Sequence, residues 1–489
     1  MPEKRSLTGL LLGPALFLLI LLLPLPAGMT PEGLRVAAVA TLMAVWWVSG
    51  AIPIPATALL PVVLYPVLGV LDGAAVTRAY GHHQIYLVRG GLLIAVTIEK
   101  WYLHHRIALH TIRLVGVTPH RIVLGFMLAT AFLSMWISNT AATMMMVTIA
   151  AAVLHEEESE IRHAPGSLRF GTALMLGIGY AASIGGVATL IGTPPNAILA
   201  GVVEKSYGYS ISFLEWLSFG LPLSLVMLAL TWLYLTRVQF RSEVEQLPGG
   251  REYIHAQLAR LGPMSRQEKQ LSVGVCTVAL LWVLRGLLLP PEPQMVKDST
   301  IAIAGALLLF LLPVDLRRGE FLLDWQTAVT IPWDIIILFG GGFALAQGFN
   351  ESGLTRWLAE QLSVMQGTQI LLIIGAVALL VVFLTEVTSN TATASLLLPV
   401  MGALAVAIEV HPFGLMVTAV VAASFAFMLP VATPPNAIVF SSRYVTIPQM
   451  VRAGIWLNLV GVVLITGFVY LLLPRVWGIV LDGPLPATP

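Results

Sequence analysis

Apolar residues lie along this chain in blocks that are long enough to cross a lipid bilayer, which takes about 20 helical residues. Four of these blocks contain no Asp, Glu, Lys or Arg. They lie between Arg5 and Glu32, between Arg35 and Asp72, between Arg121 and Glu156, and between Arg169 and Glu204. Further mostly apolar blocks cover about 212–236, 270–290, 299–314, 331–349, 362–408, 412–442 and 454–474. The pattern predicts an all-α polytopic membrane protein.

The composition agrees with this prediction and excludes several other classes. Charged residues make up 10% of the 489 residues, whereas a soluble domain carries about 25%. Cys276 is the single cysteine, so no intramolecular disulfide or thiolate metal cluster is expected. A net charge of +1 gives no basic surface for nucleic acid. No His-Glu-x-x-His motif or Ser-His pair occurs in an apolar block, so we do not expect an enzyme.

Lysine and arginine gather in short loops, which membrane proteins keep on the cytoplasmic side. These loops lie near 99–121, 237–269, 317–318 and 443–452. The first apolar block is too long for a signal peptide and is interpreted as a membrane helix. With a cytoplasmic N-terminus, all four loops are cytoplasmic only if the segments near 120–153 and 366–404 are re-entrant hairpins. This predicts about eleven transmembrane helices, two hairpins, an outside C-terminus and a multi-pass protein of the inner (plasma) membrane.

Three motifs occur twice and in the same order. Ser138-Asn139-Thr140 returns as Ser389-Asn390-Thr391, and Gly90-Gly91 returns as Gly341-Gly342, in both cases 251 positions later. Thr193-Pro194-Pro195-Asn196-Ala197-Ile198 returns as Thr433 to Ile438, 240 positions later. The halves 1–236 and 270–489 are therefore predicted to be repeats, joined by a cytoplasmic linker at 237–269. Because the hairpins enter from opposite sides, the repeats are inverted, and such repeats meet at a midplane site in secondary transporters.

The repeated motifs carry chemistry that an apolar segment does not otherwise need. A Ser-Asn-Thr turn between two half-helices offers hydroxyl and amide donors, and the following helix adds free N–H groups and its positive dipole end. This combination suits a carboxylate. The Pro-Pro pair breaks the helix, and the carbonyls freed upstream can coordinate sodium. One copy of either motif would be equally well explained as a helix cap or a kink, but two inverted copies of both favour a binding site.

These paired motifs, together with Ala131–Ile137 and Phe339–Ala344, resemble the divalent anion:sodium symporter (DASS) family over nearly the whole chain. The resemblance implies secondary active transport of small di- or tricarboxylates such as succinate, malate and fumarate, with no organic cofactor. It implies sodium-coupled symport by an elevator mechanism, in which the scaffold domains of a homodimer hold two sliding transport domains.

The resemblance also implies the site residues. The implied substrate contacts are Ser138, Asn139, Thr140, Ser389, Asn390, Thr391, Thr433 and Pro434. One implied sodium site uses Ser134, Ser138, Asn139 and the backbone near Gly192, and the other uses Thr385, Thr388, Asn390 and the backbone near Ala432. Ser134 and Thr385 are themselves 251 positions apart, so the repeat agrees with two matching cation sites.

Several points stay open from the sequence. Sodium symport and sodium-independent dicarboxylate exchange share these motifs, and sulfate or another divalent anion is an alternative substrate. Arg89 interrupts an apolar helix. It is expected either to attract anions, or to extend its side chain to the membrane surface or pair with an acidic residue. Glu386 is expected either to tune the cation site or to cap a helix. His82 and His83 are predicted to lie in an outside loop.

Overall fold

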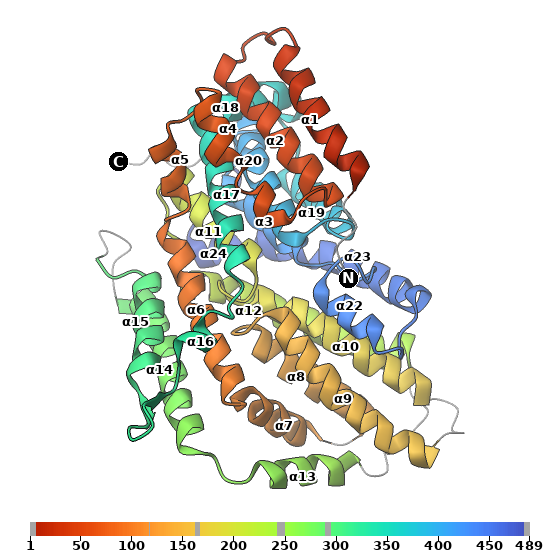
Figure 1. Cartoon of the computed structure of the whole chain (residues 1–489). Helices are drawn as coiled ribbons and strands as arrows, with labels where there is room; N and C mark the ends of the chain where they lie inside the picture. The colour runs from red at the N-terminus through yellow and green to blue at the C-terminus, as the bar shows by residue number, and fades with distance from the viewer. Residues whose placement is uncertain (1–5, 117, 162–166, 242–249, 289–294, 484–489) are drawn as a thin grey trace.

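The computed structural model describes residues 6–116, 118–161, 167–241, 250–288 and 295–483. Its first part contains α1 (Leu7–Leu22), α2 (Pro31–Ser49), α3 (Ile54–Thr57), α4 (Leu60–Val67), α5 (Gly73–Ala79), α6 (His83–Lys100), α7 (Leu103–Val115), α8 (Pro119–Ser134), α9 (Asn139–Ile161), α10 (Ser167–Val187), α11 (Pro194–Tyr207), α12 (Phe213–Leu233) and the π-helix η1 (Tyr234–Gln239). The predicted all-α class is confirmed by this succession of helices (Figure 1).

The second part begins with α13 (Gly250–Leu261). It continues with α14 (Arg266–Leu288), α15 (Asp298–Leu311), β1 (Pro313–Asp315), β2 (Glu320–Phe321), α16 (Trp325–Ala328), α17 (Trp333–Glu351), α18 (Leu354–Leu362), η2 (Ser363–Met365), α19 (Ile370–Leu384), α20 (Asn390–Ala407), α21 (Pro412–Ala423), α22 (Pro434–Ser441), α23 (Ile447–Leu471) and α24 (Leu473–Trp477). The two strands form one short antiparallel pair.

Six of the described helices are by themselves long and apolar enough to cross a membrane. Shorter apolar helices of 10–17 residues accompany them, and the segments Leu354–Met365 and Ile370–Leu384 meet at a bend of 115°. Short and bent helices are what the predicted hairpins and broken spans require. The total of eleven spans and two hairpins stays a prediction.

Both segments predicted to be hairpins are broken into two helices at their Ser-Asn-Thr turns. The first consists of α8 and α9, which lie side by side in Figure 1, and the second consists of α19 and α20. Both Thr-Pro-Pro-Asn motifs likewise follow a break, with the prolines at the start of α11 and α22. A proline fits the first helical turn because the N–H groups there have no partner within the helix.

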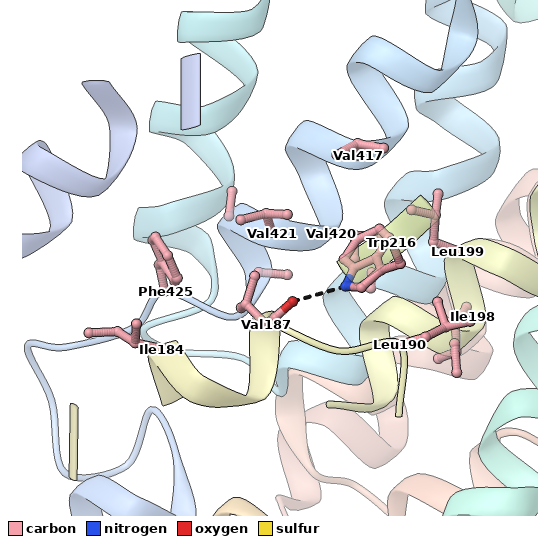
Figure 2. Close-up of a cluster of buried hydrophobic side chains, with 14 of the residues drawn as sticks. Ile184, Val187, Leu190, Ile198, Leu199, Trp216, Val417, Val420, Val421 and Phe425 are labelled. Atoms are coloured by element: carbon pink, nitrogen blue, oxygen red, sulfur yellow. Dashed lines mark hydrogen bonds between the residues drawn. The ribbon is translucent and has the colours of Figure 1, made fainter. Parts of the chain in front are cut away.

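The two halves pack against each other at these breaks. Helix α22, from the second half, packs on α9 and α10, whereas α11, from the first half, packs on α20 and α21. In α10 every residue from Phe170 to Val187 is buried, so this helix contacts protein rather than lipid. A buried cluster lies behind the break after α10, where Trp216 Nε1 donates a hydrogen bond to Val187 O at 2.9 Å (Figure 2).

Candidate functional site

The first Ser-Asn-Thr turn brings three oxygen atoms together. Ser134 Oγ, at the end of α8, lies 2.5 Å from Asn139 Oδ1 and 2.8 Å from the carbonyl oxygen of Ala182 in α10. Ser134 is fully buried. A hydroxyl has one proton and can donate only one full hydrogen bond, so this cluster has more acceptors than donors.

The second turn repeats this arrangement. Thr385 Oγ1 lies 2.8 Å from Asn390 Oδ1 and 2.9 Å from the carbonyl oxygen of Ala423 at the end of α21. Thr385 is also fully buried. The two clusters therefore have the same composition: one hydroxyl, one amide oxygen and one carbonyl oxygen.

Asn196 and Asn436 lie at the same helix breaks, and the sequence-based assignment did not include them. Asn196 Nδ2 donates to Thr189 O at 2.8 Å, and Asn436 Nδ2 donates to Leu429 O and Ala426 O, both at 3.0 Å. Each amide thus holds the carbonyls of the unwound segment that precedes its own helix. The letter-for-letter repeat of Thr-Pro-Pro-Asn was the signal that could have identified them.

Among the predicted ligands of the first sodium site, the structure brings Ser134, Asn139 and Gly192 close together. A Cβ atom at Gly186 would lie 2.7 Å from Asn139 Oδ1 and 3.2 Å from Gly192 O, so the amide and the carbonyl face the same small space. Ser138 Oγ instead accepts a hydrogen bond from Ala141 N at 3.2 Å and caps α9.

Among the predicted ligands of the second site, the structure joins Thr385 to Asn390 but gives Thr388 other partners. Thr388 Oγ1 lies 2.9 Å from Leu384 O and 2.6 Å from Thr393 Oγ1. Ala432 is fixed by its N–H, which donates to Leu429 O at 3.2 Å. No hydrogen bond within the described residues ties Ala432 to Thr385.

The predicted substrate residues lie at the starts of three helices, α9, α20 and α22. Asn139 and Asn390 begin α9 and α20. Thr433 Oγ1 accepts from Asn436 N at 3.2 Å, and the exposed Pro434 begins α22. Thr140, Ser389 and Thr391 are half-buried, and in the described part of the chain their hydroxyls have no hydrogen-bond partner. These hydroxyls are available to a ligand.

Sodium fits the two oxygen clusters. Hard cations prefer oxygen ligands from carbonyls, amides and hydroxyls. The oxygens of each cluster have a single hydroxyl proton among them. Asn196 Oδ1 and Asn436 Oδ1 are also buried without a partner in the described part of the molecule. A bound cation would satisfy lone pairs that the protons of the cluster cannot.

Replacing Gly186 by alanine is expected to raise the sodium concentration needed for half-maximal transport roughly fivefold. The new methyl group would displace the flexible Asn139 amide, and a side chain forced off its rotamer costs about 1 kcal/mol. The measurement is sodium-dependent uptake by protein in liposomes. Gly467→Ala in α23 is the matched control, because a Cβ at Gly467 has no neighbour within 4 Å. Equal sodium dependence in the two variants would contradict the placement of the Asn139 amide beside Gly186 in the sodium site.

Arg89 and the two histidines have different surroundings from those expected. The Arg89 guanidinium carbon lies 5.1 Å from the ring centre of Tyr86 and 5.0 Å from that of Trp333. Arg89 therefore makes cation–π contacts with these two rings, and no ion pair with an acidic residue is seen within the described residues. His83 Nε2 lies 2.6 Å from the carboxylate of Glu204. His82 caps α6 and is half-buried. The prediction of a loop for both histidines is wrong at His83, which is the first residue of α6.

Two solved structures define the class of fold. The Neisseria gonorrhoeae MtrF structure, described as representing a class of antimetabolite efflux pumps, superposes with a TM-score of 0.57 at 11% identity and covers 96% of both chains. The Alcanivorax borkumensis YdaH transporter superposes with a TM-score of 0.58 at 14% identity over 91% of this chain and all of that one. The chain therefore shares the fold of these two membrane transporters.

The family is defined by sequence. The model of the sodium:sulfate symporter transmembrane region matches residues 4–482, and the chain belongs to this family. It is 45% identical to the sodium-dependent dicarboxylate transporter SdcS of Staphylococcus saprophyticus, covering 98% of this chain and 94% of the relative. The protein of the same name from Staphylococcus aureus USA300 matches equally well. The resemblance inferred from the paired motifs is confirmed.

Proposed function

We propose that this protein is a secondary active symporter that couples sodium ions to the movement of small dicarboxylates such as succinate, malate and fumarate. The observation that carries the proposal is the pair of matching hydroxyl, amide and carbonyl clusters around Ser134 and Thr385. The 45% identity to transporters named for sodium and dicarboxylate supports the same conclusion.

In the proposed site, each Ser-Asn-Thr tip takes one carboxylate. The tips are Ser138–Thr140 and Ser389–Thr391, and Thr433 and Pro434 lie beside the substrate. Helices α9 and α20 begin at the tips, so their free N–H groups and positive dipole ends add to the hydroxyl and amide donors. A dicarboxylate is then held at both ends without a buried lysine or arginine.

Sodium supplies the charge that the tips lack. The proposed first site uses Ser134, Ser138, Asn139 and Gly192, and the second uses Thr385, Thr388, Asn390 and Ala432. Because the Thr388 hydroxyl is engaged with Leu384 O and Thr393 Oγ1, its backbone carbonyl is the atom proposed for the ion. Two bound cations neutralise a dianion at the site.

The test of this function is uptake of radiolabelled succinate by purified protein in liposomes. We expect saturable uptake that unlabelled succinate inside the vesicles stimulates and that external malate or fumarate inhibits. Sulfate should inhibit less well, because one compact anion cannot reach both tips. Inhibition by sulfate stronger than by fumarate would show that the substrate class is wrong.

The proposed arrangement in the membrane is a homodimer in the inner membrane, with inverted halves 1–236 and 270–489 and an elevator motion of the hairpin domains. Its orientation is testable with single cysteines in a Cys276→Ala background, since Cys276 is exposed. Arg317→Cys should react with membrane-impermeant thiol reagents only from the cytoplasm, and Gln366→Cys only from outside. Both positions are exposed. Labelling of both from one side would contradict the predicted topology.

A further inference from the structure

A cluster of two histidines, a glutamate and a lysine has no part in the proposed substrate and sodium sites. It consists of His82 and His83 at the start of α6, Glu204 near the end of α11, and Lys297, which directly precedes α15. Helix α6 packs against both α11 and α15. Side chains from three separate helices therefore meet at this point.

The Glu204 carboxylate is at the centre of the cluster. It lies 2.6 Å from His83 Nε2, and its Oε1 accepts a hydrogen bond from Lys297 Nζ at 2.6 Å. The His82 ring lies beside the His83 ring, with 4.6 Å between the ring centroids. One ligand atom from each of His82, His83 and Glu204 lies within 4.8 Å of the other two. Among the described residues, this is the one group of three such side chains placed to share a metal ion.

Two imidazoles and a carboxylate are a ligand set that zinc prefers. Zinc binds histidine nitrogen at about 2.0–2.1 Å and carboxylate oxygen at about 2.0–2.2 Å, often with three protein ligands and one open position. Tetrahedral ligands at these distances lie about 3.3 Å apart. The ligand atoms of this cluster need to close by at most about 1.5 Å, which side-chain rotation can supply. All three residues are half-buried, so an ion can reach them from solvent.

Lys297 occupies the position that a metal ion would take. Its ammonium donates to Glu204 Oε1 and lies 3.0 Å from His83 Nε2. An ammonium has three donors and no acceptor, so it contacts the same oxygen and nitrogen atoms to which a metal binds. The Lys297 side chain is 36% exposed, and its flexible stem can carry the charge into water. A metal ion and Lys297 therefore compete for the same ligands.

We propose that His82, His83 and Glu204 form a regulatory site for a divalent transition metal such as zinc, in competition with Lys297. The bound ion joins α6 to α11. Helix α11 packs on α20 and α21 and so belongs with the second hairpin, whereas α6 packs on α15. In the proposed elevator motion these two groups of helices slide past each other, so zinc inhibits transport. This inhibition rests on the proposed function, whereas metal binding does not.

A purely structural network makes a different prediction. If the cluster only ties three helices together by ion pairs, loss of Lys297 destabilises the protein and does not increase its affinity for zinc. If the cluster is a metal site, loss of Lys297 removes a competing cation and strengthens zinc binding. The two roles therefore differ in the sign of the effect.

The experiment is calorimetric titration of the purified protein in detergent with zinc chloride, without substrate. We expect the wild type to bind zinc and Glu204→Gln to bind it about tenfold or more weakly, since even indirect partners of a metal contribute that much. Lys297→Met should bind zinc at least about threefold more tightly. His82→Ala should weaken binding about tenfold while keeping both ion pairs of Glu204, so it tests the site even if Glu204→Gln does not fold.

Two variants elsewhere in the chain provide matched controls. Lys100 Nζ also donates to a carboxylate, Asp324 Oδ2, at 2.6 Å, so Lys100→Met removes a similar ion pair. His105 also belongs to an adjacent histidine pair, with 4.8 Å between its ring centroid and that of His104. Lys100→Met and His105→Ala should both bind zinc with wild-type affinity.

The second measurement is succinate uptake into proteoliposomes with and without zinc. Zinc should inhibit the wild type, and His82→Ala should need about tenfold more zinc for the same inhibition. No zinc binding by the wild type, equal binding by folded His82→Ala, or weaker binding by folded Lys297→Met would overturn the metal site. Binding without inhibition would overturn its regulatory role. A wild type without succinate uptake in the absence of zinc would instead remove the proposed function, and calorimetry would still decide the metal site.

Discussion

Replacing external sodium by choline is expected to reduce succinate uptake into proteoliposomes at least about tenfold. Succinate carries two negative charges at neutral pH, and an uncompensated charge in a site of low dielectric constant costs several kcal/mol. The two tips offer hydroxyl and amide donors but no net charge. Because about 1.4 kcal/mol corresponds to a factor of ten, loss of the cations should leave little uptake.

The control for this experiment is internal succinate at the same total ionic strength. A sodium symporter loses external uptake in choline even when the vesicles contain unlabelled succinate and no sodium. If uptake persists in choline and depends only on internal dicarboxylate, the protein is a sodium-independent exchanger, and the symport proposal is wrong.

Replacing Asn139 or Asn390 by alanine is expected to weaken succinate transport by roughly tenfold or more in each case. Each asparagine begins the helix behind its tip, and its amide oxygen contacts the buried hydroxyl of Ser134 or Thr385. Its removal takes away a proposed sodium ligand and a proposed carboxylate donor. A hydrogen bond to a charged group contributes about 1.5–3 kcal/mol, which corresponds to a factor of ten or more. The measurement is the succinate concentration dependence of uptake at fixed sodium.

Asn350→Ala provides the matched control for both variants. Asn350 also makes two side-chain hydrogen bonds, to Ser206 Oγ at 2.8 Å and from Thr355 Oγ1 at 3.0 Å, but it is exposed at the end of α17. Its loss should change transport less than about twofold, as is usual for surface substitutions. An equal loss of succinate transport in all three variants would mean that the asparagines of the tips do not bind substrate or sodium.

Threonine variants separate the substrate from the cation. Thr140→Ala and Thr391→Ala remove proposed substrate donors that are not proposed sodium ligands. At saturating sodium each should weaken succinate binding, and butyrate should compete poorly with the wild type because it satisfies one tip only. Wild-type affinity in both variants, together with competition by butyrate as strong as by fumarate, would contradict a site with two carboxylate positions.

The sequence by itself predicted the class of protein and the existence of two related sites. The interior of a bilayer imposes one simple requirement: long apolar segments whose backbone hydrogen bonds are satisfied internally. That requirement is visible residue by residue, as in the uncharged block from Arg169 to Glu204. The repeat was equally visible, because Thr-Pro-Pro-Asn-Ala-Ile occurs twice without a change.

The tertiary structure decided which atoms face one another. The carbonyl oxygens of Ala182 and Ala423 complete the oxygen clusters, and alanine gives no sign in a sequence that its carbonyl accepts a hydroxyl from another helix. Gly186 leaves the space for the Asn139 amide, but many other glycines in the chain look alike by sequence. Backbone groups at helix breaks have no residue-type signature, so only the packing of the helices reveals them.

Contacts between distant segments also explain why the sequence left the roles of charged residues undecided. Glu386 was identified from the sequence as a charge beside a motif, but its carboxylate accepts a hydrogen bond from an N–H group 41 positions away, at Phe427. Arg89 lies against Trp333, which belongs to the other half of the chain. Hydropathy and sequence repeats can be recognised from the residue types along the chain alone. Contacts between distant segments follow from how α10, α11, α21 and α22 interlock, and that arrangement exists only in the folded protein.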